Sequence, residues 1–221
     1  MFDETNIIFE DDYIIVVNKP AGLLTVSTYR QEKNTLTDKL TKIIQAKDKS
    51  KKAFPCHRLD RDTSGLIIYA KERYYQELVM QQFRYRQIRK KYIAFVRGSL
   101  RHNSGTINFP IENKNAITKF RLLQKRRGFS IIEVEPETGR TNQIRIHFAQ
   151  INHPILGERR FAFGKSFNVK FKRLALHASE IKFIHPKTKK PMEFYCKLPD
   201  DMSKLIGGQV RKNQNFNLTG T

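Results

Sequence analysis

The polar segment between His57 and Gly65 is the first place in the sequence where chemistry can be expected. It reads His-Arg-Leu-Asp-Arg-Asp-Thr-Ser-Gly and lies between Pro55 and an apolar run. A polar loop at the end of a core strand is a common place for binding and catalytic residues, although a solvated loop can have the same composition. Asp60 stands among arginines, and an opposite charge within about 4–6 Å favours an ionised carboxylate. An anionic Asp60 can serve as a nucleophile or as a base.

Other enzyme chemistries fit this segment less well. A kinase catalytic loop needs His-Arg-Asp in direct succession and a Gly-rich phosphate loop, and the sequence has neither. A carboxylate pair of a hydrolase, Asp60 with Asp62, is disfavoured because the adjacent arginines keep both groups ionised. Ser64 lacks the G-x-S-x-G context of a hydrolase nucleophile. The histidines and the two cysteines, Cys56 and Cys196, have no recognised metal-ligand spacing, so we expect no metal.

A second polar cluster runs from Glu137 to His147 and contains a glycine turn at Gly139. A turn that leads into an amide- and arginine-rich helix start suits an anion, and an ordinary helix entry with a polar first turn is equally compatible. Arg140 and Arg145 are five residues apart and do not share a helical face. We therefore expect only one of them to reach a given site.

The charge of the chain points to an anionic partner. Its 221 residues include 42 Lys and Arg against 21 Asp and Glu, a formal net charge of +21. Nucleic acid is the commonest partner that offsets such self-repulsion. Basic and aromatic residues alternate in two stretches, from Arg84 to Lys91 and from Phe161 to Phe171. In the first stretch the candidate RNA contacts are Arg86, Arg89 and Lys90, and in the second the lysines are Lys165, Lys170 and Lys172. Either stretch can also be a solvated face.

Three classes of protein are excluded by composition. No apolar run approaches the ~20 residues that span a bilayer. The acidic start of the chain, MFDETNIIFEDD, has no basic region of a secretory signal. Two cysteines are too few for a disulfide scaffold. We expect a cytoplasmic, monomeric protein without a membrane partner.

Hydrophobic periodicity predicts the elements that position these clusters. The expected strands cover residues 13–17, 65–70, 91–97, 120–124, 130–135, 174–184 and 192–198. The expected helices are one capped by Asn34 or Thr35, one over residues 72–86 and one over residues 141–151. Strands outnumber helices without regular alternation, which favours an α+β fold with a mixed, mainly antiparallel sheet. We expect one domain over residues 1–202 and a polar, mobile tail over residues 203–221.

Five motifs in order along the chain resemble those of the RluA-type pseudouridine synthases. They are Asn18-Lys19-Pro20-Ala21-Gly22-Leu23; His57-Arg58-Leu59-Asp60-x-x-Thr63-Ser64-Gly65, ending in Ala70-Lys71; Lys91-Tyr92-x-Ala94; Thr138-Gly139-Arg140-Thr141-x-Gln143-Ile144-Arg145-x-His147; and Leu174-x-Leu176-His177-Ala178. The resemblance covers about residues 8 to 200. Five ordered motifs are far more specific than any one of them.

The resemblance implies a cofactor-free isomerisation of uridine to pseudouridine in RNA. The implied fold is the pseudouridine synthase fold, with helices flanking the sheet and a basic RNA-binding cleft across its middle. By position in the motifs, Asp60 is the nucleophile, Tyr92 stacks against the flipped base and takes part in proton transfer at C5, Arg145 pairs with Asp60, and Arg58 holds the flipped-out nucleotide. Flipping a base costs a few kcal/mol, and an aromatic face returns about 1–3 kcal/mol by stacking.

The remaining candidates surround this centre. His57 and Arg140 are expected at the RNA, and Leu174 and Leu176 are expected as walls of the substrate pocket. The first motif begins near residue 8, which leaves no room before it for the S4 RNA-binding domain of many relatives. We therefore expect the catalytic domain itself to recognise a stem-loop of rRNA or tRNA, where unstacked bases are easiest to flip.

Two places depart from the family pattern. Many relatives have His where this chain has Asn142, and Gly-Asp-x-x-Tyr-Gly where it has the run Gly157 to Ala162. The nucleophile motif is intact, so the departures concern substrate contacts near Glu158 and Phe161.

Two other functions stay open at the level of sequence. The first is a non-catalytic RNA-binding or ribosome-assembly protein on the same scaffold, which the intact set of Asp60, Tyr92 and Arg145 disfavours. The second is a hydrolase of the RNA backbone, which the missing metal ligands and the missing histidine pair disfavour.

Overall fold

The structure is a computed structural model that describes residues 2–29, 31–162 and 169–207. Over these residues ten strands form one sheet, in the order β1-β2-β4-β9-β5-β8-β7-β6, with β10 beside β9 and β3 beside β4. Neighbouring strands in the described sheet are antiparallel except β4 and β9, which are parallel. The mixed, mainly antiparallel α+β architecture expected from the sequence is confirmed.

The strands are β1 (Ile7–Glu10), β2 (Ile14–Lys19), β3 (Phe54–Pro55), β4 (Ser64–Ala70), β5 (Arg89–Arg97), β6 (Ser104–Ile107), β7 (Thr118–Arg126), β8 (Phe129–Pro136), β9 (Leu176–Ile184) and β10 (Pro191–Tyr195). The helices are α1 (Leu36–Lys47), α2 (Arg73–Arg84), α3 (Gln143–Gln150) and α4 (Asp200–Leu205), with a short 3₁₀ turn over Glu4–Asn6. No helix in these described segments is long and apolar enough to cross a membrane.

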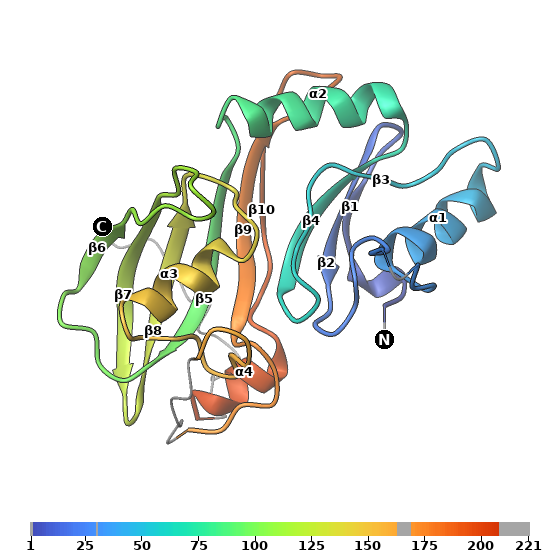
Figure 1. Cartoon of the computed structure of the whole chain (residues 1–221). Helices are drawn as coiled ribbons and strands as arrows, with labels where there is room; N and C mark the ends of the chain where they lie inside the picture. The colour runs from blue at the N-terminus through green and yellow to red at the C-terminus, as the bar shows by residue number, and fades with distance from the viewer. Residues whose placement is uncertain (1, 30, 163–168, 208–221) are drawn as a thin grey trace.

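The sheet consists of two groups of strands that meet at one short parallel contact. Ser64 lies opposite His177, and Gly65 lies opposite Ala178. Gly65 has φ +116°, and a Cβ at this residue would lie 2.2 Å from the carbonyl oxygen of Ala178, so only glycine permits this approach. Figure 1 shows β1, β2 and β4 on one side of this junction, β5 to β10 on the other, and α2 across the top.

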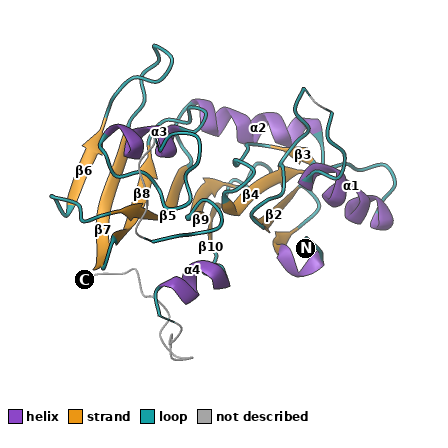
Figure 2. Ribbon diagram, turned by 60° about the horizontal axis from the view of Figure 1, so that its bottom comes forward, coloured by secondary structure: helices purple, strands orange, loops and turns teal. Residues whose placement is uncertain are grey.

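The helices cover the sheet with the faces that their apolar spacing predicts. Leu36, Leu40 and Ile44 of α1 are buried and belong to the main core. Thr35 caps α1 and forms a capping box with Asp38, as one of the two expected caps. On α3, Phe148 packs edge-on against Phe120 of β7, with the ring centroids 5.6 Å apart. Figure 2 shows α1 and α3 on one side of the strands and α4 on the other.

Some boundaries differ from the sequence-based prediction. Helix α3 begins at Gln143 and not at residue 141, because Asn142 adopts a left-handed conformation with φ +56°. Strands β1 and β6 were not predicted; each has four residues and depends on pairing with a longer neighbour. Helix α4 runs past the expected domain end at residue 202, and Met202 itself is buried. Most of the expected tail, residues 208–221, lies outside the described residues.

Candidate active site

The loop that carries Asp60 connects β3 to β4, and hydrogen bonds join it to the end of β2 and to the segment that follows β2. Lys19, the last residue of β2, is completely buried and donates from Nζ to the carbonyl oxygens of Pro20 (3.0 Å), Leu23 (2.7 Å) and Arg61 (3.0 Å). An ammonium group has three donors, and these carbonyls accept all of them. Burial lowers the pKa of Lys19 to about 7, and the charges of nearby aspartates, including Asp60, oppose that shift. The buried amino group of Lys19 therefore ties the loop to the segment after β2.

A second set of bonds fixes the residues on either side of Asp60. The Oγ1 of Thr25 donates to the carbonyl oxygen of Leu59 at 3.0 Å and accepts from its N–H at 3.3 Å. The N–H of Gly22 donates to the carbonyl oxygen of Arg61 at 2.9 Å. The backbone on both sides of Asp60 is therefore bonded to residues 22–25.

Arg145 and Asp60 meet although 85 residues separate them. The Nη1 of Arg145, in the first turn of α3, donates to Oδ2 of Asp60 at 3.3 Å. The two side chains are 17% and 26% exposed, so the pair is partly screened from solvent. Arg140, the other arginine of this cluster, is half-buried and donates from Nε to the carbonyl oxygen of Asn115 at 3.0 Å. Arg145 is the one that reaches Asp60.

Tyr92 lies on β5 in the same core as the leucines expected near the substrate. Tyr92, Leu174 and Leu176 are all buried. Burial raises the pKa of the Tyr92 hydroxyl, and the negative charge of Asp60 raises it further. The phenol therefore stays protonated at neutral pH, in electrostatic contact with Asp60.

The other expected RNA contacts are spread over several environments. Arg58 is exposed. The Nε2 of His57 accepts from the N–H of Ile68 at 3.1 Å, its ring packs on Phe83 with centroids 4.8 Å apart, and burial lowers its pKa to about 3. This histidine is a neutral anchor inside the fold, and its contact with RNA stays a prediction.

The basic stretch after α2 is partly engaged by the protein itself. Arg86 is exposed, Arg89 pairs with Glu135 at 3.2 Å, and Lys90 lies 5.4 Å over the ring of Phe83. Burial lowers the pKa of Lys90 to about 8.

The second basic and aromatic stretch is described only at its ends. Phe161 lies under Arg145 and Phe171 under Arg173, at 5.1 and 5.5 Å. Lys165 lies outside the described residues.

Glu158 and Lys19 are the residues of this site that the sequence analysis did not assign. Glu158 binds Arg145 through two bonds, from Nε at 2.7 Å and from Nη2 at 2.9 Å. Its departure from the family pattern was the available signal. For Lys19 the signal was a lysine at the end of an apolar strand, where a charge must find partners.

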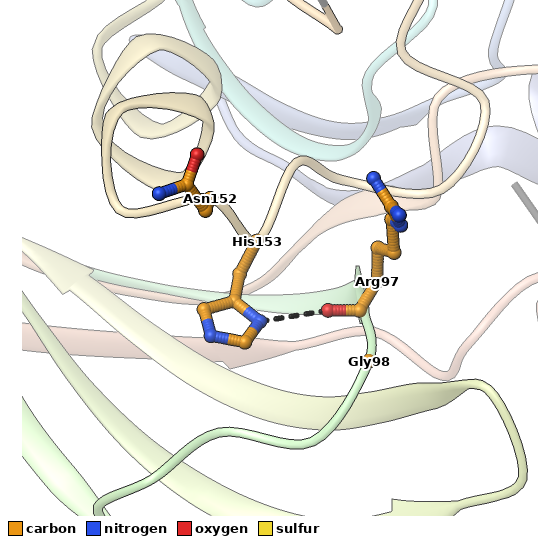
Figure 3. Close-up of a pocket in the computed structure, with 4 residues that line it drawn as sticks. All are labelled: Arg97, Gly98, Asn152 and His153. Carbon is orange, nitrogen blue, oxygen red and sulfur yellow. Dashed lines mark hydrogen bonds between the residues drawn. The ribbon is translucent and has the colours of Figure 1, made fainter. Parts of the chain in front are cut away.

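Two cavities of about 360 Å³ lie away from Asp60. One is lined by Arg97, Gly98, Asn152 and His153, where the Nδ1 of His153 hydrogen-bonds the carbonyl oxygen of Arg97 at 2.8 Å (Figure 3). Arg97 is five residues from Tyr92 on β5, or about 16 Å at roughly 3.3 Å per residue. The other cavity lies between α1 and the β1–β2 turn and is lined by Glu10, Asp11, Asp12, Ile44, Lys47, Asp48, Lys51 and Lys71. Among the described residues no group of three His, Cys, Asp or Glu side chains is placed to hold a metal ion.

Comparisons with known proteins agree with this geometry. Residues 13–150 match the family model described as RNA pseudouridylate synthase. The dual-specificity RNA pseudouridine synthase RluA of Haemophilus influenzae is 34% identical, over 87% of this chain and 92% of that protein. The ribosomal large subunit pseudouridine synthase D of the same organism is 33% identical, over 91% of this chain and 69% of that protein.

Solved structures show the same fold. Human RNA pseudouridylate synthase domain containing 4 superposes with a TM-score of 0.77 at 22% identity and covers 90% of both chains. The fold, the ordered motifs and these relatives define a pseudouridine synthase, which is an isomerase. The chain belongs to the RNA pseudouridylate synthase family, and to the RluA type within it.

Proposed function

We propose that this enzyme isomerises a uridine in a stem-loop of rRNA or tRNA, with Asp60 as the nucleophile. The observation that carries the proposal is the bond of 3.3 Å between Arg145 and Asp60, on a loop fixed by buried hydrogen bonds. At about 4 Å and an effective dielectric near 20, such a pair is worth up to ~4 kcal/mol before desolvation. Arg145 thereby favours the ionised carboxylate that attack requires.

The reaction needs no redox cofactor, because the isomerisation neither oxidises nor reduces the nucleotide. An oxygen of Asp60 forms a covalent bond with the target nucleotide, and the bond between N1 of uracil and C1′ of the ribose breaks. The uracil turns so that C5 faces C1′, and a C5–C1′ bond forms. The hydrogen on C5 leaves as a proton, and N1, whose bond to C1′ has broken, takes up a proton. The bond to Asp60 breaks again, so the product has the atoms of the substrate.

Tyr92 and Arg58 have different tasks in this scheme. The buried phenol of Tyr92 offers a face for the flipped base, and its hydroxyl is the group that we assign to proton transfer at C5. Arg58 is exposed two residues before Asp60, where it can occupy the space that the flipped nucleotide leaves. RNA binding and chemistry thus begin on the same loop.

The substrate class is supported by the names of the relatives and by the cost of base flipping. One relative is named for the large ribosomal subunit and another for dual specificity. Loops present bases that are already unstacked, so flipping costs least there. Mapping pseudouridine in total RNA with and without the gene identifies the target.

A short hairpin that spans the mapped uridine tests the substrate class. We expect this hairpin, labelled with tritium at C5, to release tritium at a rate comparable to the full transcript, because the loop supplies the flippable base. The same sequence placed in a continuous duplex should release none. Modification of full-length RNA alone would show that remote contacts dominate. A non-catalytic RNA-binding protein would bind the hairpin and release no tritium from any substrate.

A further inference from the structure

Asp60 is not the only partner of the Arg145 guanidinium among the described residues. The other hydrogen bonds that this guanidinium makes are shorter than the one to Asp60. Glu158 accepts from Nε at 2.7 Å and from Nη2 at 2.9 Å, which is a bidentate pair. Asn142 accepts from Nη1 at 2.7 Å through Oδ1. The ring of Phe161 lies 5.1 Å from the guanidinium carbon, within cation–π range. The bond to Asp60, at 3.3 Å, is the longest of these hydrogen bonds.

Glu158 is itself fixed on all sides. Its side chain has no exposed surface, and its Oε1 also accepts from the N–H groups of Arg160 (2.8 Å) and Phe161 (3.2 Å). Burial disfavours its charge, yet the bonds from Arg145 hold the pKa of Glu158 below its usual value. Glu158 is therefore a buried anion with a fixed position.

The backbone that carries Glu158 is tied to the core of the sheet. The N–H of Leu156 donates to the carbonyl oxygen of Phe95 on β5 at 2.8 Å, and Leu156 accepts from Ala175 at 2.9 Å. Gly157 has φ +78°, and a Cβ there would lie 1.7 Å from the carbonyl oxygen of Arg173. This close approach leaves the carboxylate of Glu158 little freedom to move.

From these contacts we infer that Glu158, assisted by Asn142 and Phe161, is the positioning residue for Arg145 in the isomerisation. The inference rests on the proposed role of Asp60. Because Glu158 takes two donors of the guanidinium, Arg145 meets Asp60 with one donor and one carboxylate oxygen. A bidentate pair between Arg145 and Asp60 would instead engage both oxygens of the nucleophile.

Three of the departures from the family pattern meet at one side chain. Asn142, Glu158 and Phe161 differ from the motifs of the relatives, and all three contact Arg145. The side chain of Glu158 is completely buried and binds Arg145, so the departure at this residue bears on that arginine. The three residues form one support for a single guanidinium.

A Glu158→Gln variant separates positioning from binding. The glutamine keeps the size of the side chain and removes its charge and one acceptor, so the guanidinium no longer has a bidentate partner. We expect the single-turnover rate on the labelled RNA to fall about 10²-fold, the size typical of misplacing a reacting group by about 1 Å. The Kd for the same RNA should stay within about twofold. Glu158→Asp, which keeps the carboxylate, should recover most of the rate.

Two further variants complete the test: one removes a second partner of Arg145, and the other is a control on the surface. Asn142→Gly preserves the left-handed backbone and removes the acceptor for Nη1, so it should lower the rate about tenfold without touching buried Glu158. Glu77→Gln on α2 changes an exposed, ion-paired glutamate and should keep the wild-type rate. A wild-type rate for Glu158→Gln, or equal losses for Glu158→Gln and Glu158→Asp, overturns the inference. Wild-type protein that releases no tritium from any RNA overturns the proposed function instead.

Discussion

Arg145 lies between two carboxylates of different character. Asp60 is partly exposed, while the side chain of Glu158 has no exposed surface. Burial opposes the charge of Arg145, but Glu158 and then Asp60 raise its pKa above the usual value. Removing one partner of a buried pair costs more than the pair contributes, because the other charge is left uncompensated. The arginine therefore supports the fold as well as the chemistry.

The Arg145→Met substitution should lower both the stability of the fold and the rate of the reaction. We expect the rate of tritium release to fall steeply while the Kd for RNA changes little, and the free energy of unfolding to fall by about 3–5 kcal/mol because Glu158 loses its partner. Urea unfolding and RNA binding measure the two effects. Adding Glu158→Gln should restore part of the stability and none of the rate. Arg140→Met, at a half-buried arginine of the same polar cluster whose bond to Asn115 is exposed, should stay within about 0.5 kcal/mol of wild type. An Arg145→Met protein as stable as wild type contradicts this account.

Among the single residues of the site, the sequence predicted those whose residue type already suggests a chemical role. Asp60 among arginines and the motif position of Arg145 were sufficient to predict their pairing. Glu158 looked like any glutamate in a polar loop, and its role depends on burial, which short-range patterns do not show. For His57 the motif predicted an RNA contact, which stays a prediction, but the motif did not show that its ring accepts a bond from the N–H of Ile68.

Between β4 and β9, a buried histidine connects the two groups of strands. The Nδ1 of His177 bonds Oγ of Ser64 at 2.9 Å, and its Nε2 bonds Sγ of Cys196 at 3.1 Å. Burial lowers the pKa of His177 to about 4, against 6.5 for an ordinary histidine. Between these two pH values the unfolded chain binds a proton that the folded protein does not. The contribution to stability is therefore complete above about pH 6.5 and is lost as the pH falls toward 4.

This linkage predicts an acid-sensitive junction. Each such histidine contributes about 1.4 kcal/mol per pH unit to the loss of stability below pH 6. His177→Asn should therefore show a shallower fall in the free energy of unfolding between pH 5.5 and 4.5, by about that amount. Urea unfolding at several pH values measures it, with His102→Asn at an exposed site as the control that keeps the wild-type slope. Parallel slopes for wild type and His177→Asn would contradict the predicted linkage.

The elements themselves were predictable where periodicity is strong. Strand β5 and helix α2 follow their apolar patterns closely, and the hairpin of β7 and β8 was expected around Gly128. The sequence Ser-Gly-Thr-Ile of β6 has no strand pattern, and this segment becomes a strand because β7 pairs with it. The β4–β9 junction rests on two residue pairs, so its register comes from tertiary packing and not from local propensity.

Over the whole molecule, some of the cations behind the net charge of +21 already form ion pairs with carboxylates of the protein. Arg89 pairs with Glu135, and Lys91 lies 3.5 Å from both Glu133 and Glu180. Pairs with exposed members are worth about 0–1 kcal/mol, so RNA phosphates can compete for these cations. Composition predicted a nucleic-acid partner, but it could not show which cations are already paired.

The stretch after α2 should contribute to RNA affinity as a group. Replacing Arg86, Arg89 and Lys90 together by Gln should weaken binding to any RNA. It should also lower the slope of log K against log salt by ~0.7–0.9 for each phosphate that the variant no longer neutralises. Replacing Lys42, Lys49 and Lys52 by Gln removes the same charge from an exposed region near α1 and should leave the slope nearly unchanged. An unchanged slope in the first triple variant shows that the stretch is a solvated face.

The most direct test of the account is the Asp60→Asn substitution. Asparagine keeps the shape of the side chain and an acceptor for Arg145, but it removes the charge and the nucleophilic oxygen. We expect tritium release from C5-labelled RNA to vanish, while the Kd for that RNA stays close to the wild-type value. Asp62→Asn, two residues along the same loop, should retain turnover. Appreciable turnover by Asp60→Asn, or equal losses in both variants, would contradict the assignment of Asp60 as the nucleophile.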